Sequence, residues 1–154
     1  MQVVRGDLIR LAEAGRFDVI VHGANCQCAM GAGIAKAIRE HFPEAYEVDR
    51  RTAKADRAKL GTISCADIVR GGLHFVVVNA YTQFDLRGRG VRVDYEAVRT
   101  AMREVKARFS GKRIAYPRIG GGLAKGDWSK LSQIIDDELL GEDHTLVEYD
   151  APAS

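Results

Sequence analysis

Few features of this chain point to a disulfide framework, a membrane span or a strongly charged surface. Its 154 residues include three cysteines, an odd number that cannot pair fully, so we expect a reducing, cytoplasmic environment. No apolar run reaches the roughly 18 residues that cross a bilayer, and the first residues lack the apolar segment of a signal peptide. The net charge of +2 is too small to indicate nucleic-acid binding by itself. We therefore expect a globular monomer that does not contact a membrane.

Apolar runs alternate along the chain with apolar stripes at helical spacing. The β-branched runs predict strands, and one of them is expected to form a hairpin with its successor across the turn at Gly71-Gly72. Asp94 is a plausible N-cap, and Pro43 is expected to end another helix. This alternation predicts a three-layer α/β/α sandwich around a mixed, roughly six-stranded sheet, built as a single domain from residues 1–154. The predicted strands lie at 3–4, 17–22, 61–65, 73–80, 113–116 and 145–149, and the helical stripes at 34–42, 98–109 and 131–139.

Two glycine-rich segments each follow a predicted strand and lead into a helix. The first contains Gly31 and Gly33, and the second contains Gly120, Gly121 and Gly122 in succession. Glycine lets the backbone approach a ligand closely, and a helix N-terminus offers free N–H groups to a phosphate. A single loop of this kind is usually only a tight turn, but two at corresponding strand ends predict a clamp for a diphosphate. In an α/β sheet, such a site belongs at the carboxyl ends of the strands.

Other patterns that bind nucleotides or metals are missing from the chain. It has no G-x-x-x-x-G-K-[ST] and no G-x-G-x-x-G after the first strand, which argues against a P-loop kinase and a dinucleotide dehydrogenase. Cys26 and Cys28, even with His22 nearby, do not supply the about four suitably spaced ligands of a zinc site. We therefore expect neither a metal nor a cofactor.

Four segments, taken in order, resemble the macrodomain family over nearly the whole chain: 6–8, 18–25, 30–35 and 117–122. Members of that family bind ADP-ribose. The resemblance implies that Asp7 contacts the adenine amino group, that Asn25 lies by the distal ribose, and that the glycine loops hold the diphosphate. Tyr149 either lies near the adenine or is a buried strand residue. The implied ligand-binding residues are Asp7, Leu8, Ala24, Asn25, Met30, Gly31, Ala32, Gly33, Ile34, Pro117, Ile119, Gly120, Gly121, Gly122, Leu123 and Tyr149.

Two kinds of relative imply different chemistry at the distal ribose. The spacing from His22 to the first glycine loop is similar to that of terminal ADP-ribose glycohydrolases and DNA ADP-ribosyl glycohydrolase antitoxins. Those enzymes use a lysine where this chain has Gln83, and the terminal glycohydrolases use an aspartate where it has Ala124. A glutamine amide is neither a nucleophile nor a base. The chain also resembles the yeast ADP-ribose-1″-phosphate phosphatase, which implies catalytic roles for His22, Asn25 and Thr82.

His22 can be interpreted in two ways, and three functions remain open. With a reference pKa near 6.5, a histidine at a strand end can serve as a general acid or base, but it can also be a hydrogen-bonded core residue. In the first, the chain is an enzyme that releases phosphate or an ADP-ribosylated partner. In the second, it is a reader that binds ADP-ribose or its protein and nucleic-acid conjugates. In the third, it is a nucleic-acid-binding module that uses the arginines of segment 85–92. The charged segment 49–59 is predicted to be a solvated helix face.

Overall fold

Six strands form one sheet in the computed structural model, which describes residues 1–85, 90–122 and 124–150. They are β1 (Gln2–Gly6), β2 (Val19–Asn25), β3 (Ile63–Arg70), β4 (Leu73–Gln83), β5 (Arg113–Tyr116) and β6 (Asp143–Tyr149). Their order across the sheet is β1-β6-β5-β2-β4-β3. Neighbouring strands are parallel except β3 and β4, which form the antiparallel hairpin expected from the sequence. The predicted mixed sheet is therefore confirmed.

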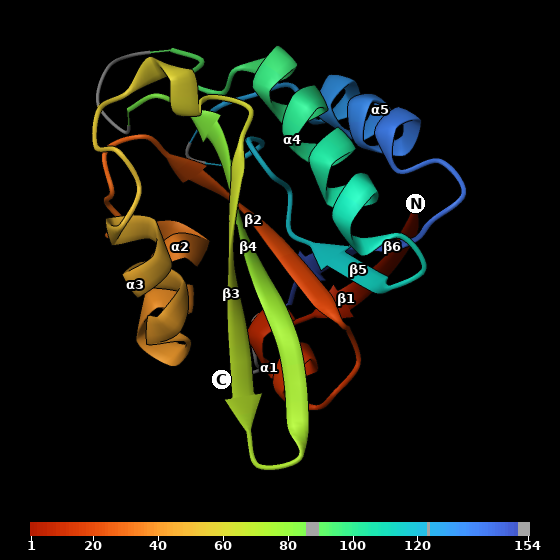
Figure 1. Cartoon of the computed structure of the whole chain (residues 1–154). Helices are drawn as coiled ribbons and strands as arrows, with labels where there is room; N and C mark the ends of the chain where they lie inside the picture. Colours follow the sequence, from red (N-terminus) through yellow and green to blue (C-terminus); the bar gives the residue numbers. More distant parts are fainter. Residues whose placement is uncertain (86–89, 123, 151–154) are drawn as a thin grey trace.

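Helices cover both faces of this sheet, as Figure 1 shows. The described helices are α1 (Leu8–Glu13), α2 (Gly33–His41), α3 (Pro43–Arg50), α4 (Tyr95–Phe109), α5 (Trp128–Glu138) and the short 3₁₀ helix η1 (Arg57–Lys59). Apolar residues of α1, α2 and α3 pack on one face, and those of α4 and α5 pack on the other. This arrangement is the predicted three-layer α/β/α sandwich.

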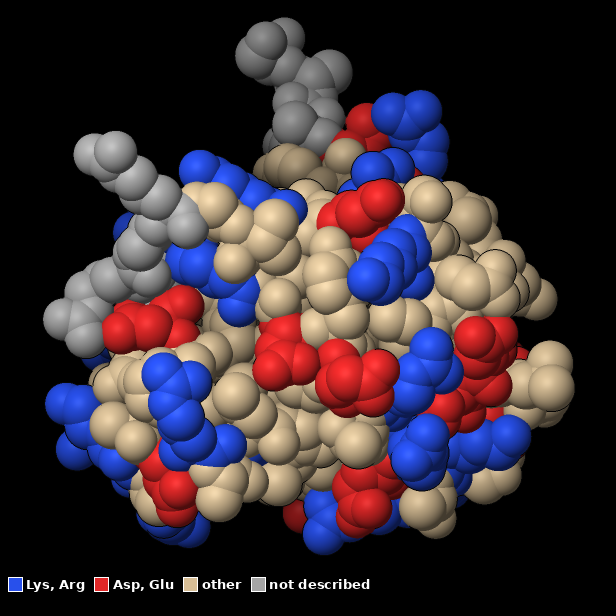
Figure 2. All heavy atoms as spheres, turned by 90° about the horizontal axis from the view of Figure 1, so that it is seen from above, with Lys and Arg blue, Asp and Glu red and all other residues tan. Residues whose placement is uncertain are grey.

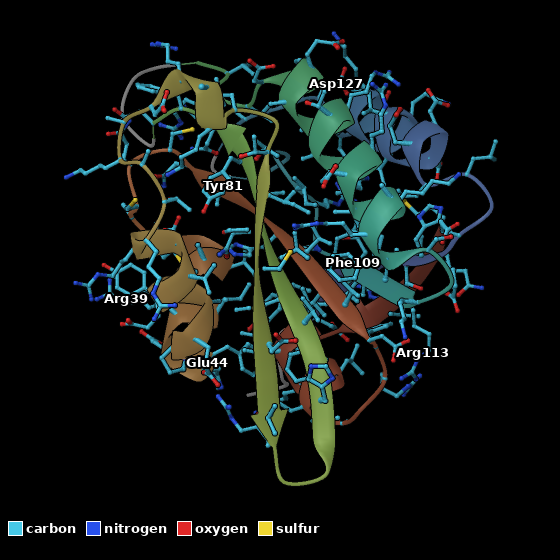
Figure 3. The ribbon with its side chains drawn as sticks, viewed as in Figure 1. Arg39, Glu44, Tyr81, Phe109, Arg113 and Asp127 are labelled. Atoms are coloured by element: carbon cyan, nitrogen blue, oxygen red, sulfur yellow. The ribbon has the colours of Figure 1, made fainter. Side chains whose placement is uncertain are left out.

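Side-chain alternation along the strands divides the core between the two faces. In β2, Val19 and Val21 belong to the apolar cluster under α4 and α5, whereas Ile20 belongs to the cluster under α1, α2 and α3. Successive residues of a strand point to opposite faces, so this division follows from the strand itself. Tyr81 on β4 lies on the α3 side and Phe109 at the end of α4 lies on the opposite side (Figure 3).

The helix boundaries agree with the capping residues in the sequence. The side chain of Asp94 accepts a hydrogen bond from the Ala97 N–H at 3.0 Å and begins α4. Asp127 begins α5 in the same manner. Pro43 ends α2 as predicted, and it also begins α3, because a proline in the first turn of a helix has no N–H to leave unpaired.

The prediction of a helix over residues 49–59 is wrong, and although residues 53–58 are exposed as expected, the two ends of the segment are not. The helix α3 ends at Arg50, and the chain continues through turns to η1. Asp49 and Lys59 are buried, with exposed fractions of 1% and 8%. The carboxylate of Asp49 accepts a hydrogen bond from the Tyr81 hydroxyl at 2.8 Å, and Lys59 Nζ donates to the Thr52 hydroxyl at 2.7 Å. These polar partners allow both residues to lie in the interior.

The parallel strands bring two loops together at one edge of the sheet. Strands β2, β4 and β5 run in the same direction, so their carboxyl ends meet at this edge. The loop 26–32 connects β2 to α2, and the loop 117–127 connects β5 to α5. In the part of the chain that the structure describes, no helix is long and apolar enough to cross a bilayer.

Candidate functional site

The two glycine loops line one cavity of about 270 Å³. The backbone of Gly33 begins α2 with φ +58°, and Gly120 has φ +73°, conformations that side-chain-bearing residues adopt at a cost. A Cβ at Gly120 would lie 2.5 Å from Val93 Cγ2. The expected meeting of the two loops is therefore found in the structure. The predicted residues that line this cavity are Ala24, Asn25, Ala32, Gly33, Ile34, Pro117, Ile119, Gly120 and Gly122.

A second cavity of about 540 Å³ continues from the first toward α1. Gly33, Ile34 and Pro117 line both cavities, so together they form one groove. Asp7 and Tyr149 lie at its far end, with Leu8 beside them. Tyr149 is 70% exposed, which removes the alternative that it is a buried strand residue.

Asp7 has a structural contact of its own in this second cavity. Its Oδ1 accepts hydrogen bonds from the N–H groups of Ile9 and Arg10, at 2.9 and 3.3 Å, and caps α1. These two bonds use one carboxylate oxygen, and a carboxylate has several acceptor positions. Asp7 can therefore cap the helix and accept a further hydrogen bond from a ligand.

Several predicted ligand-binding residues line neither cavity. Met30 is buried in the core under α2, and a Cβ at Gly31 would meet no atom within 4 Å. Gly121 has ordinary space for a side chain, with Trp128 Cε3 at 3.4 Å. The crowded glycine of this loop is its neighbour Gly120. Leu123 lies outside the described residues.

His22 is a core residue that does not line the cavity. It is fully buried, and its Nε2 lies 2.6 Å from Asn79 Oδ1. The Asn79 amide nitrogen donates to Ala45 O and to Ser64 Oγ, so Oδ1 is the acceptor and His22 Nε2 carries the proton. Burial lowers the pKa of His22 to about 4, and the hydrogen bond to Asn79 opposes this only in part. The expected titration near 6.5 is therefore corrected: His22 is neutral at pH 7.

The polar side chains that line the first cavity are almost all uncharged. Asn25 and Gln83 are paired across β2 and β4 and present two neighbouring amides. The Asn25 amide is tied into its own loop, because Nδ2 donates to Ala29 O and Oδ1 accepts from the Gln27 N–H. Gln83 Nε2 donates to Asp85 O at 3.0 Å. The pairing of these two amides could not be read from a single segment of sequence.

Arg118 carries the one ionisable side chain among the described residues that line this cavity. It does not lie free, because its guanidinium makes three contacts of 2.6 to 3.0 Å with the Glu148 carboxylate. That pair lowers the pKa of Glu148. Over its described residues, the cavity wall therefore holds no carboxylate, imidazole, thiol or amine that could act as a general base.

A buried polar cluster, missed by sequence reasoning, holds the loop 26–32 from behind. Lys59 Nζ lies 3.4 Å from Cys26 O and 3.7 Å from Cys28 Sγ, and Cys28 Sγ donates to Asp49 O at 3.4 Å. Burial raises the pKa of the Asp49 carboxyl. The alternating charges of segment 49–59 predict exposure to solvent, so the burial of Asp49 and Lys59 could not be predicted from the sequence. Among the described residues, no three His, Cys, Asp or Glu side chains gather to hold a metal ion.

Charges of both signs are interspersed over the loop end of the molecule, which Figure 2 shows from above. No single-sign field covers this face in the view. The segment 85–92, whose arginines would contact phosphate under the nucleic-acid hypothesis, lies partly outside the described residues, because these do not include 86–89. Arg92 is described, and its N–H donates to Ala124 O at 2.8 Å, next to the first cavity.

Comparisons with known proteins agree with this architecture. Residues 21–135 match the family model Macro domain. The chain is 32% identical over 141 residues to an uncharacterized 17.5 kDa protein of Enterobacteria phage T4, a match that covers 88% of each chain. It is 25% identical over 149 residues to the ADP-ribose glycohydrolase OARD1 of Bos taurus, covering 95% of this chain and 88% of that one.

Solved structures share the fold. Thermosipho africanus DarTG in complex with ADP-ribose superposes with a TM-score of 0.74 at 14% identity, covering all of this chain and 43% of that one. At 14% identity, this similarity shows a shared fold and no more. The family model, in contrast, spans most of the chain, and the chain therefore belongs to the Macro domain family.

Proposed function

We propose that this protein binds ADP-ribose, either free or joined through its distal ribose to phosphate, protein or nucleic acid. The observation that carries the proposal is the single groove formed by the two cavities that share Gly33, Ile34 and Pro117. ADP-ribose has three chemical parts: a base, a diphosphate and a terminal sugar. The groove offers a different chemical environment for each of them.

The far end of the groove suits the adenine base. Apolar side chains of Leu8, Ile34 and Val147 line it, and the Asp7 carboxylate supplies an acceptor for an amino group. The exposed ring of Tyr149 lies at the same end. Apolar walls with one placed polar group are typical of sites that hold a planar base.

The middle of the groove suits the diphosphate. Gly33 is the first residue of α2, where unpaired N–H groups and the positive end of the helix dipole favour an anion. Across the groove, Gly120 and Gly122 present backbone without side chains. Bringing a phosphate close to two backbone segments requires this lack of side chains.

The near end of the groove suits an uncharged sugar. Asn25 and Gln83 offer amide donors and acceptors there, and no described side chain at this end other than Arg118 carries a charge. Relatives support the proposal, because OARD1 is named an ADP-ribose glycohydrolase and DarTG was solved in complex with ADP-ribose.

Hydrolysis at the distal ribose is a second candidate function, favoured by the name of the Bos taurus relative. His22 is fully buried and does not line the cavity, and its lowered pKa of about 4 makes the neutral ring a weak base. Turnover would therefore depend on uncharged groups, with Asn25, Gln83 and Thr82 orienting the substrate or a water molecule. The substrates to test are ADP-ribose-1″-phosphate and ADP-ribosylated protein and DNA.

Calorimetry with ADP-ribose, ADP and AMP tests the binding proposal. We expect affinity to fall in that order, because each step removes a part of the ligand that the groove accommodates. Equal affinity for ADP and ADP-ribose would contradict a sugar site at Asn25 and Gln83. Release of phosphate or of the ADP-ribosylated partner by the wild-type protein would identify an enzyme, and its absence on all three substrates would leave a reader.

A further inference from the structure

Cys28, in the loop 26–32, has its thiol against the side-chain amine of Lys59. The Cys28 Sγ atom lies 3.7 Å from Lys59 Nζ. Cys28 is half-buried and therefore partly open to solvent, whereas Cys26, two residues earlier, has no exposed surface. Since an oxidised thiol condenses with a neighbouring nucleophile, a thiol in contact with an amine can form a covalent bond to it.

Lys59 carries a buried charge that forms no ion pair with a carboxylate of the described residues. It is 8% exposed, and Nζ donates to neutral groups, the Thr52 hydroxyl at 2.7 Å and Cys26 O at 3.4 Å. Within the same described part of the chain, the buried Oδ2 of Asp49 has no hydrogen-bond partner either. Cys28 contacts both residues, because its Sγ also donates to Asp49 O at 3.4 Å. Buried charges are normally paired, so their separation around a thiol requires an explanation.

Two backbone segments hold the sulfur and the nitrogen together behind the first cavity. The Ala55 N–H donates to Cys26 O at 2.7 Å, which fixes the chain before η1 against the loop 26–32. Cys28 has φ +55°, a left-handed conformation that a residue with a side chain adopts at a cost. Lys59 is the last residue of η1. The contact between Cys28 and Lys59, which are 31 residues apart in the chain, therefore depends on ordered backbone on both sides.

The other two thiols are placed differently. Burial raises the pKa of the Cys26 thiol, which disfavours the thiolate that peroxides oxidise. Cys65 on β3 lies beside Arg108, whose Nη1 donates to its sulfur at 3.3 Å, and burial raises the pKa of this thiol as well. A guanidinium stays protonated, so it cannot attack an oxidised sulfur. Of the three thiols, Cys28 is therefore the one with an amine in contact among the described residues.

We propose that Cys28 and Lys59 form an oxidation site, at which hydrogen peroxide joins Sγ to Nζ by a covalent sulfur–nitrogen bond. The Cys28 thiolate attacks one peroxide oxygen and breaks the O–O bond, which gives a sulfenic acid and hydroxide. The hydroxide takes a proton from the Lys59 ammonium and becomes water. The free amine then attacks the sulfenic sulfur, the S–O bond breaks, and the leaving hydroxide takes a proton from the nitrogen to become a second water. The sulfur loses two electrons in this sequence, and the peroxide gains them.

The new bond ties the loop 26–32 to η1. Cys28 and Lys59 line neither cavity of the groove, so the site goes beyond the proposed binding of ADP-ribose. The next residue, Ala29, does line the first cavity, and its carbonyl accepts a hydrogen bond from the Asn25 amide. A cross-link within the chain restricts its unfolded state, so the oxidised protein should melt at a higher temperature than the reduced one. Peroxide thus restrains one wall of the groove from behind.

Mass spectrometry of the full chain after treatment with hydrogen peroxide tests the site. We expect a product lighter by two hydrogen atoms, in which the peptide containing Cys28 is joined to the peptide containing Lys59. Dithiothreitol should restore the original mass, because thiols reduce a sulfur–nitrogen bond. Cys26→Ala should still form the product, which distinguishes it from a disulfide between Cys26 and Cys28 of the same mass.

Variants of Lys59 separate its amine from its charge. Lys59→Met should abolish the joined product, whereas the matched control Lys54→Met, an exposed lysine of the same segment, should keep it. Lys59→Arg retains a positive charge without a nucleophilic amine, so it should stop at the sulfenic acid, which dimedone labels at Cys28. Melting temperatures establish that each variant is folded before peroxide is added.

Three results would overturn the inference. They are a wild type that gains only oxygen at Cys28 or does not react, a joined product that persists in Lys59→Met, and a product that disappears in Cys26→Ala. None of them bears on the proposed function, because ADP-ribose binding is measured by calorimetry on the untreated protein. A failure to bind ADP-ribose would likewise leave the oxidation site standing.

Discussion

Replacing His22 with glutamine should remove an acid-dependent loss of stability from this protein. The pKa of His22 is about 4 in the folded chain and 6.5 in the reference state. Because the folded pKa is lowered, the neutral form stabilises the fold. That contribution is complete above pH 6.5 and is lost as the pH falls toward 4. The difference of 6.5 − 4, or 2.5 units, corresponds to about 3 kcal/mol in the free energy of unfolding.

Urea unfolding of the wild type and His22→Gln at several pH values between 7.5 and 4.5 measures this contribution. Glutamine can still donate to Asn79 Oδ1, so the variant should fold. We expect the wild type to lose about 2–3 kcal/mol relative to the variant by pH 4.5. Other buried groups, such as His144, whose pKa burial also lowers, titrate in both proteins and cancel in the difference.

A pH-independent difference between the two proteins would mean that His22 is not buried as described. Enzymatic turnover provides a second test of the role of His22. If the wild type proves to be a hydrolase, its rate should show no step near pH 6.5 that His22→Gln removes. Finding such a step, together with a large loss of turnover in the variant, would restore the catalytic role that the family resemblance implies.

Three further substitutions test the groove. Gly120→Ala should lower the free energy of unfolding, measured by urea denaturation, by about 2–4 kcal/mol, because it combines positive φ with a clash against Val93. Gly121→Ala should leave the free energy of unfolding nearly unchanged in the same assay. Gly33→Glu should leave a folded protein that no longer binds ADP-ribose in calorimetry. The uncharged Gly33→Asn, in which asparagine tolerates positive φ, should lose less ADP-ribose affinity. Equal affinities of the two variants would mean that this helix start does not contact phosphate. Asp7→Ser should keep the melting temperature, because serine also caps helices, but it should weaken ADP-ribose binding. Asp7→Ala should lower both the melting temperature and the ADP-ribose affinity. An unchanged affinity in both variants would mean that Asp7 only caps α1.

Local patterns predicted the fold because they report on local structure. The cap at Asp94, the break at Pro43 and the turn at Gly71-Gly72 each depend on a few neighbouring residues, and the structure has all three. The two glycine loops were also visible, since loop composition and strand order suffice to place them at one edge of the sheet. Element boundaries and the start of α3 at Pro43 needed the structure.

The roles of individual site residues depend on contacts that sequence spacing does not encode. His22 was a catalytic candidate by position, but burial against Asn79 makes it a core residue. Lys59 was expected in solvent and instead supports the loop beside the cavity. The close approach of Thr82 to Gly23, where a Cβ would lie 2.9 Å from Thr82 Oγ1, arises from the register of β2 against β4, which no single segment contains.

The hydrogen bond from the Asp94 N–H to Thr82 O links the end of β4 to the start of α4. Thr82 and Gln83 extend past the part of β4 that pairs with β3, whose ladder begins at the Ile63–Ala80 pair. The end of β4 is thus held by β2 on one side and by Val93 and Asp94 on the other. The exchange rate of the Asp94 amide hydrogen therefore reports on the rigidity of the end of β4. Its hydrogen–deuterium exchange should slow when a ligand bound beside Gln83 stiffens this end of β4, although the amide itself lies outside the cavity.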